Sequence, residues 1–417
     1  MLNVALVGVS GFADFHYREL LALRQKGLVR LLCATVINQD EEAAKCQTLR
    51  EIGCELFSDH QRMLREGRGR IDLCVIPTGI HLHAPMTVDA LHADCHVLVE
   101  KPAAATVEEV TWMQEEERRS GKSVAVAYQH LYAPEIMKMK RDLLGGKIGR
   151  LLAVKCLGLW PRPESYYKRN NWAGRLKHGE SWVLDSPFNN AFAHWLNLIC
   201  FLAGSTAEAS AHPRTVQAEL YRARAIESAD TACFRIETTG DIPLFFHVTH
   251  SCLQNLEPEL EVRGSDGSLC WTRAGIFHRS QNGSERLYAV SSENASRRHM
   301  YEAVLRHISG EKTSVCGLEI AKQQTLCSNA AFFSSPINDI PSEFLVKGEA
   351  PAPKVVAIRD IEKIFRTAFE QEIVWSQMPV PWARAGRIIP TEDFRKSMKD
   401  DGMPAPIVVA PIGNISV

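Results

Sequence analysis

The sequence predicts an α/β domain built on a doubly wound parallel sheet, followed by an α+β domain built on a mostly antiparallel open sheet. Three observations carry this prediction. Short apolar runs alternate with helical periods from residue 1 to about 130, which is the pattern of a parallel sheet. Strand-like runs separated only by turn residues dominate between residues 215 and 262, as in an antiparallel sheet. The chain of 417 residues is also longer than one hydrophobic core normally grows.

The first domain, residues 1–130, is expected to hold five strands and a weaker sixth. The strands are predicted at residues 3–7, 29–37, 71–76, 96–99 and 123–128, with the weaker one at 55–57. Helical periods cover residues 15–25, 41–52, 86–93 and 107–120, and several of them are followed by a glycine, which commonly ends a helix. Such a sheet binds ligands where the carboxyl ends of its strands meet the connecting loops.

The second domain is expected over residues 131–371. Its predicted strands are 151–157, 215–223, 231–238, 244–251 and 260–262, and its predicted helices are 187–203, 297–308, 318–331 and 355–370. The last helix is expected to pack back on the first domain. Residues 372–417 are rich in proline and charge, so we expect them to form an extended C-terminal arm.

The overall charge argues against a nucleic-acid partner. Lys and Arg number 48 against 49 Asp and Glu, which gives a formal net charge of -1. A chain without a cationic surplus lacks the charge that neutralises phosphates in most nucleic-acid complexes. We therefore expect small-molecule partners.

No membrane span or targeting signal is expected. The N-terminal apolar run stops at Gly8 and has no basic flank, and the most apolar later stretch, residues 191–204, is too short to cross a bilayer. The 12 cysteines are scattered without a C-x-x-C motif, which is typical of buried thiols in a reducing compartment. These features predict a cytoplasmic protein.

A glycine-containing turn follows the first predicted strand. The run Gly8-Val9-Ser10-Gly11-Phe12-Ala13 precedes the first helix, where a dinucleotide-binding turn belongs. The full G-x-G-x-x-G pattern gives the backbone a tight turn and a close approach to a pyrophosphate. Here Ser10 and Ala13 replace the second and third glycines, and Gly11 offers another close approach. The motif alone leaves cofactor binding and an ordinary strand-to-helix turn equally open.

The end of the second predicted strand does not choose between NAD and NADP. An acidic side chain there would bind the adenosine ribose of NAD, but Ile37 and Asn38 occupy the place and Asp40 comes too late. No arginine stands beside them to hold the 2′-phosphate of NADP. The sequence therefore predicts NAD or NADP without deciding which.

Two later motifs are more specific. A predicted strand ends in Pro77-Thr78, with His81 and His83 close behind, and the next strand is followed by Glu100-Lys101-Pro102. Together with Tyr128-Gln129-His130, Asp185, Asp230-Thr231 and the turn at 264–267, they resemble the Gfo/Idh/MocA family of nucleotide-dependent sugar and polyol oxidoreductases. The resemblance covers about residues 1 to 370.

The resemblance implies an N-terminal Rossmann domain and a second domain whose open sheet often mediates oligomers, so a homodimer or homotetramer is expected. Lys101 inherits the family's catalytic lysine beside the nicotinamide. Desolvation next to the positively charged ring is expected to lower its pKa toward neutrality, so that it can accept a hydroxyl proton. The residues expected to contact the cofactor are Gly8, Ser10, Gly11, Phe12, Ala13, Asn38, Pro77, Thr78, His81, His83, Glu100, Lys101 and Gln129.

The second-domain motif departs from the family's pattern. Asp185 fits the first position, but Asn189 stands where the family has a histidine. Ser186 and Pro187 predict a helix that begins at residue 187, which would place Asn190 and His194 four apart on one face. Catalytic roles are assigned to Lys101, Asp185 and His194, with His194 replacing the missing histidine or serving only a structural role.

The loop before that predicted helix is rich in aromatic, amide and basic residues. This mixture suits a carbohydrate, because aromatic faces pack on sugar C–H groups while amides and cations bind hydroxyls and acidic groups. A surface loop with its own small core is the alternative. The expected substrate contacts are Lys101, Arg162, Tyr166, Lys168, Asn171, Trp172, Asp185, Asn190 and His194.

No metal site is expected. His247 and His250 are three residues apart in a predicted strand, so their side chains lie on opposite faces. The sequence thus predicts an NAD(P)-dependent dehydrogenase that acts on CH–OH groups of a sugar-like polyol. Two alternatives stay open: a catalytically silent sensor or regulatory subunit with the same fold, and an NAD-using lyase or glycosidase.

Overall fold

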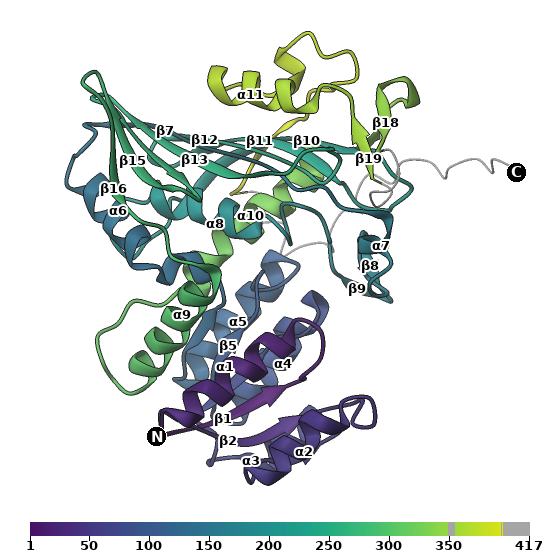
Figure 1. The fold of residues 1–417 in the computed structure, drawn as a ribbon, viewed down its shortest axis with the longest axis vertical. Helices are drawn as coiled ribbons and strands as arrows, with labels where there is room; N and C mark the ends of the chain where they lie inside the picture. Colours follow the sequence, from purple (N-terminus) through teal and green to yellow (C-terminus); the bar gives the residue numbers. More distant parts are fainter. Residues whose placement is uncertain (349–354, 393, 395–417) are drawn as a thin grey trace, which may run out of the picture. The chain divides into compact units, whose positions relative to one another are not determined.

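The computed structural model describes residues 1–348, 355–392 and 394. They form two compact units (Figure 1). The first unit joins residues 1–137 and 291–325, and the second joins residues 138–290 with the described residues from 326 onward. The chain therefore returns to the first unit after most of the second sheet is complete, whereas the predicted boundaries at residues 130 and 371 placed this returning segment in the second domain.

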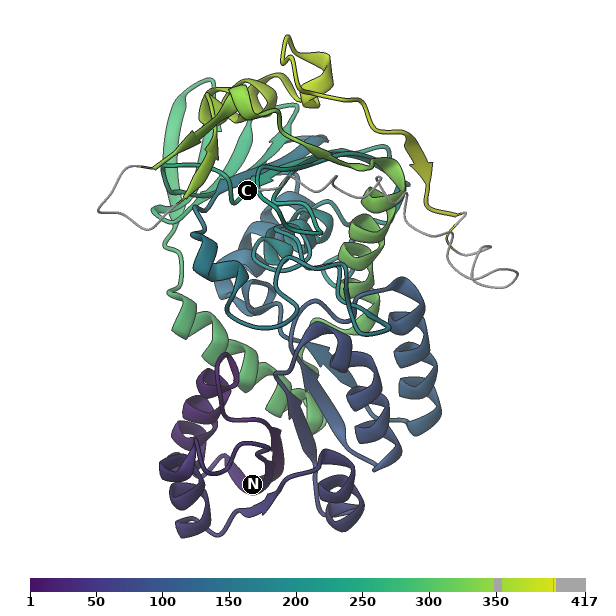
Figure 2. The ribbon, with the colours of Figure 1, turned by 90° about the vertical axis from the view of Figure 1, so that its right-hand side faces the viewer.

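Within the described residues, the first unit holds a parallel sheet of six strands in the order β3-β2-β1-β4-β5-β6. This is the strand order of a Rossmann fold, and it confirms the predicted doubly wound sheet. Helices lie on both of its faces (Figure 2). The strands are β1 (Leu2–Val7), β2 (Val29–Thr35), β3 (Glu55–Phe57), β4 (Leu73–Ile76), β5 (His96–Val99) and β6 (Val124–Val126).

The helices that connect these strands carry ordinary end signals. Thr106 and Glu109 form a capping box at the start of α5 (Val107–Ser120), and Gly121 ends it with φ 68°. α4 begins six residues before its predicted start. The prediction began the helix after Pro85, but Pro85 lies inside the helix, where it removes one backbone hydrogen bond without breaking the helix. The other connecting helices are α1 (Ala13–Gln25), α2 (Ala43–Glu51), α3 (His60–Gly67) and α4 (Ile80–His92).

The segment 291–325 is bound to the first unit by specific contacts. It contains α9 (Glu293–Ile308) and the first part of α10 (Leu318–Ser334). On α9, Tyr301 Oη lies 2.7 Å from Nδ1 of the buried His16 on α1. The backbone N–H of Val126 donates to Cys316 O at 2.8 Å, next to an antiparallel bridge between Ala125 and Gly317. These long-range contacts explain why this segment belongs to the first unit.

The second unit is built on a mixed, mostly antiparallel sheet, as predicted. The main path of described strands runs β16-β15-β14-β13-β7-β12-β11-β10-β17. The pairs β7–β12 and β10–β17 are parallel. The strands are β7 (Leu151–Leu159), β10 (Pro213–Arg222), β11 (Thr231–Thr238), β12 (Pro243–Thr249), β13 (Leu256–Gly264), β14 (Ser268–Thr272), β15 (Gly275–Ser280), β16 (Gly283–Tyr288) and β17 (Ile337–Asp339).

Both faces of this sheet are packed. α8 (Ala193–Leu202) and α11 (Ile361–Gln371) lie on opposite sides of it (Figure 1). Neighbouring side chains of a strand point to opposite faces: Phe246 contacts Phe234 on the α8 side, whereas His247 contacts Phe365 of α11. The last helix thus packs on the second unit's own sheet, and not on the first domain as expected.

The end of the described chain adds to the same packed face. α11 starts at Ile361 because residues 356–358 form strand β19, which pairs with β18 (Leu345–Lys347), so the predicted helix 355–370 began too early. Trp375 is fully buried against Tyr221, and β20 (Ile388–Pro390) pairs with β10. Residues 395–417, the rest of the expected extended arm, lie outside the described residues.

No helix among the described residues is long and apolar enough to cross a membrane.

Lys140 is a fully buried cation of the second unit, on α6 (Pro134–Leu144). Its Nζ donates to the carbonyls of Phe201 and Gly204, at 2.5 Å each, where α8 ends. Helix-terminal carbonyls attract cations, but burial disfavours the ammonium and lowers its pKa to about 7. Lys140 therefore caps the C-terminal end of α8, although burial disfavours its charged form.

Replacing Lys140 with methionine is expected to change how stability depends on pH. Between pH 7 and about 10 the unfolded wild type keeps a proton that the folded state has lost, so the wild type gains up to about 1.4 kcal/mol of unfolding free energy per pH unit from this group. Below pH 7 both states are protonated and the contribution is constant. Urea unfolding of both proteins at pH 7, 8 and 9 measures the difference. Parallel curves would contradict the assignment.

Candidate functional site

The glycine turn between β1 and α1 has the backbone shape that a pyrophosphate requires. Gly8 and Gly11 have φ values of 89° and 58°, which side chains with a Cβ rarely adopt. A Cβ added at Gly11 would meet no atom within 4 Å, so there is open space in front of the turn. Phe12 is half exposed, and Ala13 begins α1. The N–H groups of Ala13 and Asp14 already donate to Ser10 O and Gly11 O, so it is the open space in front of the turn that fits a dinucleotide at this helix start.

The end of β2 is polar and carries several carboxylates nearby. Asn38 Nδ2 donates to Ser10 Oγ at 3.2 Å and to Glu41 Oε2 at 2.9 Å. The Lys45 ammonium donates to Val9 O at 2.8 Å and pairs with Asp14 and Glu42, each at 2.9 Å. The sequence-predicted residues Ser10 and Asn38 thus come together beside the turn, while Lys45 was missed because it is distant in the sequence.

The loop after β4 is held by His83. His81 and His83 lie in the first turns of α4, which begins before the predicted helix 86–93. The buried His83 ring contacts Pro102 O at 2.7 Å and Thr78 O at 3.1 Å, and burial lowers its pKa. His83 therefore ties the Pro77-Thr78 end of β4 to the segment that follows β5.

Thr78 also offers an unused polar atom at this strand end. Among the described residues, nothing forms a hydrogen bond with its buried Oγ1. A buried hydroxyl normally has a partner, so the carboxyl end of β4 fits a polar ligand. Together with the open glycine turn, this observation supports binding of a dinucleotide along this edge of the sheet.

The segment after β5 places Lys101. The buried Glu100 accepts from His16 Nε2 at 3.0 Å and from the N–H of Lys101 at 3.0 Å. Although burial opposes it, the hydrogen bond from His16 is the main effect that lowers the pKa of Glu100. The Lys101–Pro102 peptide is cis, and Lys101 is half buried. Glu100 thus links the backbone of Lys101 to His16, a residue that no sequence motif indicated.

Gln129 lies in the buried turn η1 (Gln129–Tyr132), directly after β6. Its Nε2 donates to Glu293 Oε2 on α9 at 3.0 Å. The residues predicted to contact the cofactor therefore come from the carboxyl ends of β1, β2, β4, β5 and β6. This is the edge of a Rossmann sheet where ligands bind.

In the second unit, Asp185 is a buried carboxylate with an organised set of donors. Its Oδ2 accepts from Gly174 N at 2.7 Å, its Oδ1 accepts from Asn190 Nδ2 at 2.8 Å, and Arg169 lies 3.8 Å away. The structure thus brings the two predicted residues Asp185 and Asn190 together. Arg169, which no sequence motif singled out, belongs to the same cluster.

The helix predicted to begin at residue 187 begins at Ala193 instead. Ser186 does accept the N–H of Asn189, but residues 187–192 form successive turns. Asn189 is fully buried, and its amide donates to the carbonyls of Val183 and Leu184, at 3.3 Å each. These bonds explain the delayed start. Asn189 therefore holds the backbone, and the buried His194 lies in the first turn of α8.

The loop of residues 160–182 forms a small aromatic and cationic cluster of its own. Trp160 stacks on Phe192 at 4.4 Å, while the Arg169 guanidinium lies 3.8 Å from the ring centre of Tyr166 and 5.3 Å from that of Trp172. Arg162 lies over Tyr166 at 5.0 Å. Arg162, Tyr166 and Trp172 thus lie close together, whereas Lys168 and Asn171 are exposed.

Behind this loop lies a buried ion pair. The Arg224 guanidinium lies 3.3 Å from Asp230, and Asp230 also accepts the N–H of Ala223 at 2.9 Å. His250 Nδ1 lies 3.1 Å from Tyr167 Oη. Burial is the main cause of the strongly lowered pKa of His250, with the nearby arginines adding to it. Among the described residues, no group of three or more metal-ligating side chains lies together.

The fold and these residues define a class: an oxidoreductase-type chain with a dinucleotide-binding Rossmann unit and a second unit on a mixed sheet. Residues 2–128 match the model of the oxidoreductase family with an NAD-binding Rossmann fold (GFO_IDH_MocA), and residues 136–270 match the GFO/IDH/MocA C-terminal domain. The chain therefore belongs to the Gfo/Idh/MocA family, as its motifs indicated.

Individual relatives are distant. D-xylose dehydrogenase of Paenarthrobacter nicotinovorans is 24% identical over 292 residues, which cover 64% of this chain and 73% of that protein. D-glucoside 3-dehydrogenase of Escherichia coli (strain K12) is 25% identical over 158 residues, which cover 38% of this chain and 43% of that protein. For the second relative, the match thus spans less than half of its length.

Solved structures show the same fold. The WlbA dehydrogenase from Bordetella pertussis, in complex with NADH and UDP-GlcNAcA, has a TM-score of 0.63 at 21% identity and covers 79% of this chain and 95% of that chain. Levoglucosan dehydrogenase, in complex with NADH and L-sorbose, has a TM-score of 0.67 at 18% identity and covers 79% of this chain and 96% of that chain. These likenesses concern the fold.

Proposed function

We propose that this chain is an NAD-dependent dehydrogenase that oxidises a secondary hydroxyl of a sugar or polyol. The observation that carries the proposal is the supported Glu100-Lys101-Pro102 segment at the carboxyl end of β5. Glu100 is held by His16 at 3.0 Å, and Pro102 O is held by His83 at 2.7 Å. An amine on such a constrained segment can take a proton from a hydroxyl.

The glycine turn, the buried Thr78 hydroxyl and Gln129 are the residues of the first unit that we assign to cofactor binding. Once bound there, the nicotinamide would supply the hydride acceptor. Lys101 is assigned as the base that accepts the hydroxyl proton when the sugar is oxidised, and as the acid that returns it in the reverse direction.

In the second unit, we assign sugar recognition to the cluster around Asp185. Because both of its oxygens accept hydrogen bonds, Asp185 is a positioning residue that orients the amide of Asn190. Tyr166 and Trp172 offer aromatic faces for sugar C–H groups. His194 is assigned a substrate contact, since Asn189, at the place of the family's histidine, is committed to backbone carbonyls.

We expect the enzyme to prefer NAD over NADP by at least about tenfold in kcat/KM. A 2′-phosphate at the end of β2 would lie near Glu41 and Glu42, and like charges that close are unfavourable. Lys45 cannot compensate, because it is neutralised by Asp14 and Glu42. The hydrogen bond from Lys45 lowers the pKa of Glu42, which keeps that carboxylate charged at neutral pH.

The double variant Glu41→Gln/Glu42→Gln should narrow this preference, because it removes two negative charges and leaves Lys45 with one partner fewer. Steady-state kinetics with both cofactors measures the ratio. Glu51→Gln is the matched control, since Glu51 is a carboxylate of the same helix that accepts from Gln47. An unchanged ratio in the double variant would contradict the role of these carboxylates.

The proposed function is tested by a substrate screen. The purified protein is incubated with NAD and a panel of aldoses, glycosides, sugar acids and inositols, and NADH is followed at its absorbance band. Net NADH production with at least one compound supports the proposal. Cofactor binding by calorimetry without any turnover would favour a sensor, and product formation without net NADH would favour a lyase or glycosidase; either result overturns the dehydrogenase assignment.

A further inference from the structure

A cavity of about 650 Å³ lies in the second unit. Its walls come from α7 (Glu164–Tyr167) and the loop after it, from the connection between β10 and β11, and from the hairpin of β18 and β19. The volume falls in the range of roughly 300–1,000 Å³ that is typical of small-molecule sites. None of the roles proposed above requires this cavity.

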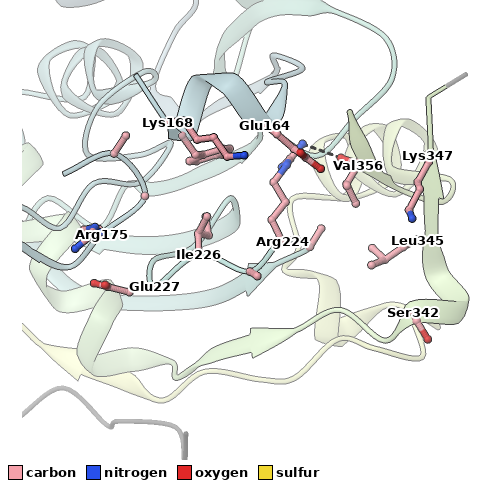
Figure 3. A pocket seen from close by; sticks show the side chains of 15 residues that line it. Glu164, Lys168, Arg175, Arg224, Ile226, Glu227, Ser342, Leu345, Lys347 and Val356 are labelled. Atoms are coloured by element: carbon pink, nitrogen blue, oxygen red, sulfur yellow. Dashed lines mark hydrogen bonds between the residues drawn. The ribbon is translucent and has the colours of Figure 1, made fainter. Parts of the chain in front are cut away.

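Three cations line the cavity. Lys168, Arg175 and Lys347 all lie in its wall, and among the described residues no side chain or carbonyl bonds to their charged groups. Figure 3 shows Lys168 and Lys347 on opposite sides of the cavity, with Arg224 between them. Surface cations that converge without carboxylate partners favour an anionic ligand.

Two carboxylates also line the cavity, and they offset only part of these charges. Glu227 Oε2 accepts the backbone N–H of Leu176 at 3.2 Å, and Glu164 forms no ion pair among the described residues. Three cations therefore face two carboxylates, which leaves one formal positive charge in the wall, since Arg224 is paired with Asp230. The remaining charge balance of the wall is positive.

Arg224 makes the wall rigid. Its side chain is only 5% exposed, and its two terminal nitrogens donate to Ser251 Oγ at 2.6 Å, to Val356 O at 2.8 Å and to Arg162 O at 2.9 Å. The bond to Val356 is visible in Figure 3. Its Nε is buried without a partner among the described residues. A wall held in this way reduces the cost of ordering a ligand.

The rest of the lining is apolar and suits carbon atoms. Ala223, Ile226, Leu345 and the ring of Tyr167 contribute to it. We infer that this cavity is a second ligand site of the chain, for a small organic molecule that carries a carboxylate or a phosphate. The cations bind the anionic group, and the apolar wall covers the carbon skeleton.

The wall of this site is continuous with the Asp185 cluster. Gly174 lines the cavity, and its N–H donates to Asp185 Oδ2 at 2.7 Å. Ala173, also in the wall, donates its N–H to Asn170 Oδ1 at 2.8 Å. A bound molecule would therefore order the same loop that holds Asp185, so occupancy is expected to change the KM of the sugar substrate.

Isothermal titration calorimetry tests the site with gluconate and glucose 6-phosphate as anionic probes and glucose as the neutral one. Both anions should bind with one site per chain and more weakly at high salt, and glucose should bind at least tenfold more weakly.

The double variant Arg175→Gln/Lys347→Gln should lose at least tenfold in anion affinity. Lys147→Gln, which removes an exposed lysine away from the cavity, should not. Equal binding by wild type and double variant would overturn the inference, as would equal binding of glucose.

Lys347→Gln alone repeats the test with a single exposed substitution, and melting temperatures establish that each variant is folded. Binding here and binding at the sugar site are separated by titrating in the presence of a saturating neutral substrate found in the screen. Persistent binding supports a second site, whereas competition by the neutral substrate would show that the anions bind at the sugar site and would overturn the inference. The Lys101→Ala variant should bind the anions unchanged. Absence of turnover with every sugar would therefore overturn the proposed function and leave this site intact.

Discussion

Replacing Lys101 with alanine is expected to lower kcat by about 10²–10⁴-fold, the usual loss when a general acid–base group is removed. The reason is local. The segment around Lys101 is held by Glu100 to His16 and by Pro102 O to His83, so its backbone should persist without the amine. The affinity for NAD, measured by calorimetry, is expected to stay within a few-fold of the wild type.

The loss must be specific to this amine. Lys122→Ala serves as the matched control, because Lys122 is a lysine of the same unit that pairs with Asp94 at 3.3 Å. Lys101→Arg should restore little activity, since a guanidinium keeps its proton at any working pH. Turnover of the alanine variant within threefold of the wild type, in a folded protein, would show that another group carries the proton.

Trp375→Ala is expected to destabilise the second unit by about 3–5 kcal/mol, the range for removing a large buried aromatic side chain. Trp375 is fully buried. Its ring centre lies 5.6 Å from that of Tyr221, 5.1 Å from that of Phe365 and 5.8 Å from that of Trp382. The next residue is also anchored, because Ser376 Oγ and N–H both donate to the buried Glu219.

Urea unfolding followed by fluorescence measures this effect, with Trp112→Ala as the control because Trp112 is 41% exposed. The control should change the unfolding free energy by less than about 1 kcal/mol, as is usual at the surface. An equally small change for Trp375→Ala would mean that the segment after α11 does not belong to the core of this unit. The expected loss instead makes residues 361–382 an integral layer on the sheet.

This layer bears on how copies of the chain could associate. The resemblance led us to expect oligomers through the open sheet of the second domain, but here Ile361, Phe365 and Trp375 pack with Leu157 and Tyr221 in one core cluster. A homodimer or homotetramer remains a prediction. If it forms, the part of the sheet under α11 is already occupied by the chain's own residues.

Local patterns were sufficient to predict the sheet of the first unit. The alternation of apolar runs and helical periods gave its six strands within a few residues, because a buried parallel strand needs consecutive apolar side chains. The glycine turn and Glu100-Lys101-Pro102 were identified from residues that are neighbours in sequence. Each motif lies at the carboxyl end of its strand because it directly follows β1 or β5 in the sequence.

Other features depended on contacts between residues far apart in the chain. The start of α8 at Ala193 depends on the Asn189 amide, which is held by the carbonyls of Val183 and Leu184, and end signals alone pointed to residue 187. His16 gained its role from Glu100, 84 positions away. No periodicity or short motif carries that information.

The sequence by itself thus determined the fold class, the family and the position of Lys101, because these depend on hydrophobic period and on short motifs. Only the tertiary structure decided that residues 291–325 return to the first unit, that α11 covers the second sheet, and that Lys168, Arg175 and Lys347 line one cavity. The physical reason is that the burial of a side chain and the pairing of a charge depend on neighbours in space, and here those neighbours come from separate segments of the chain.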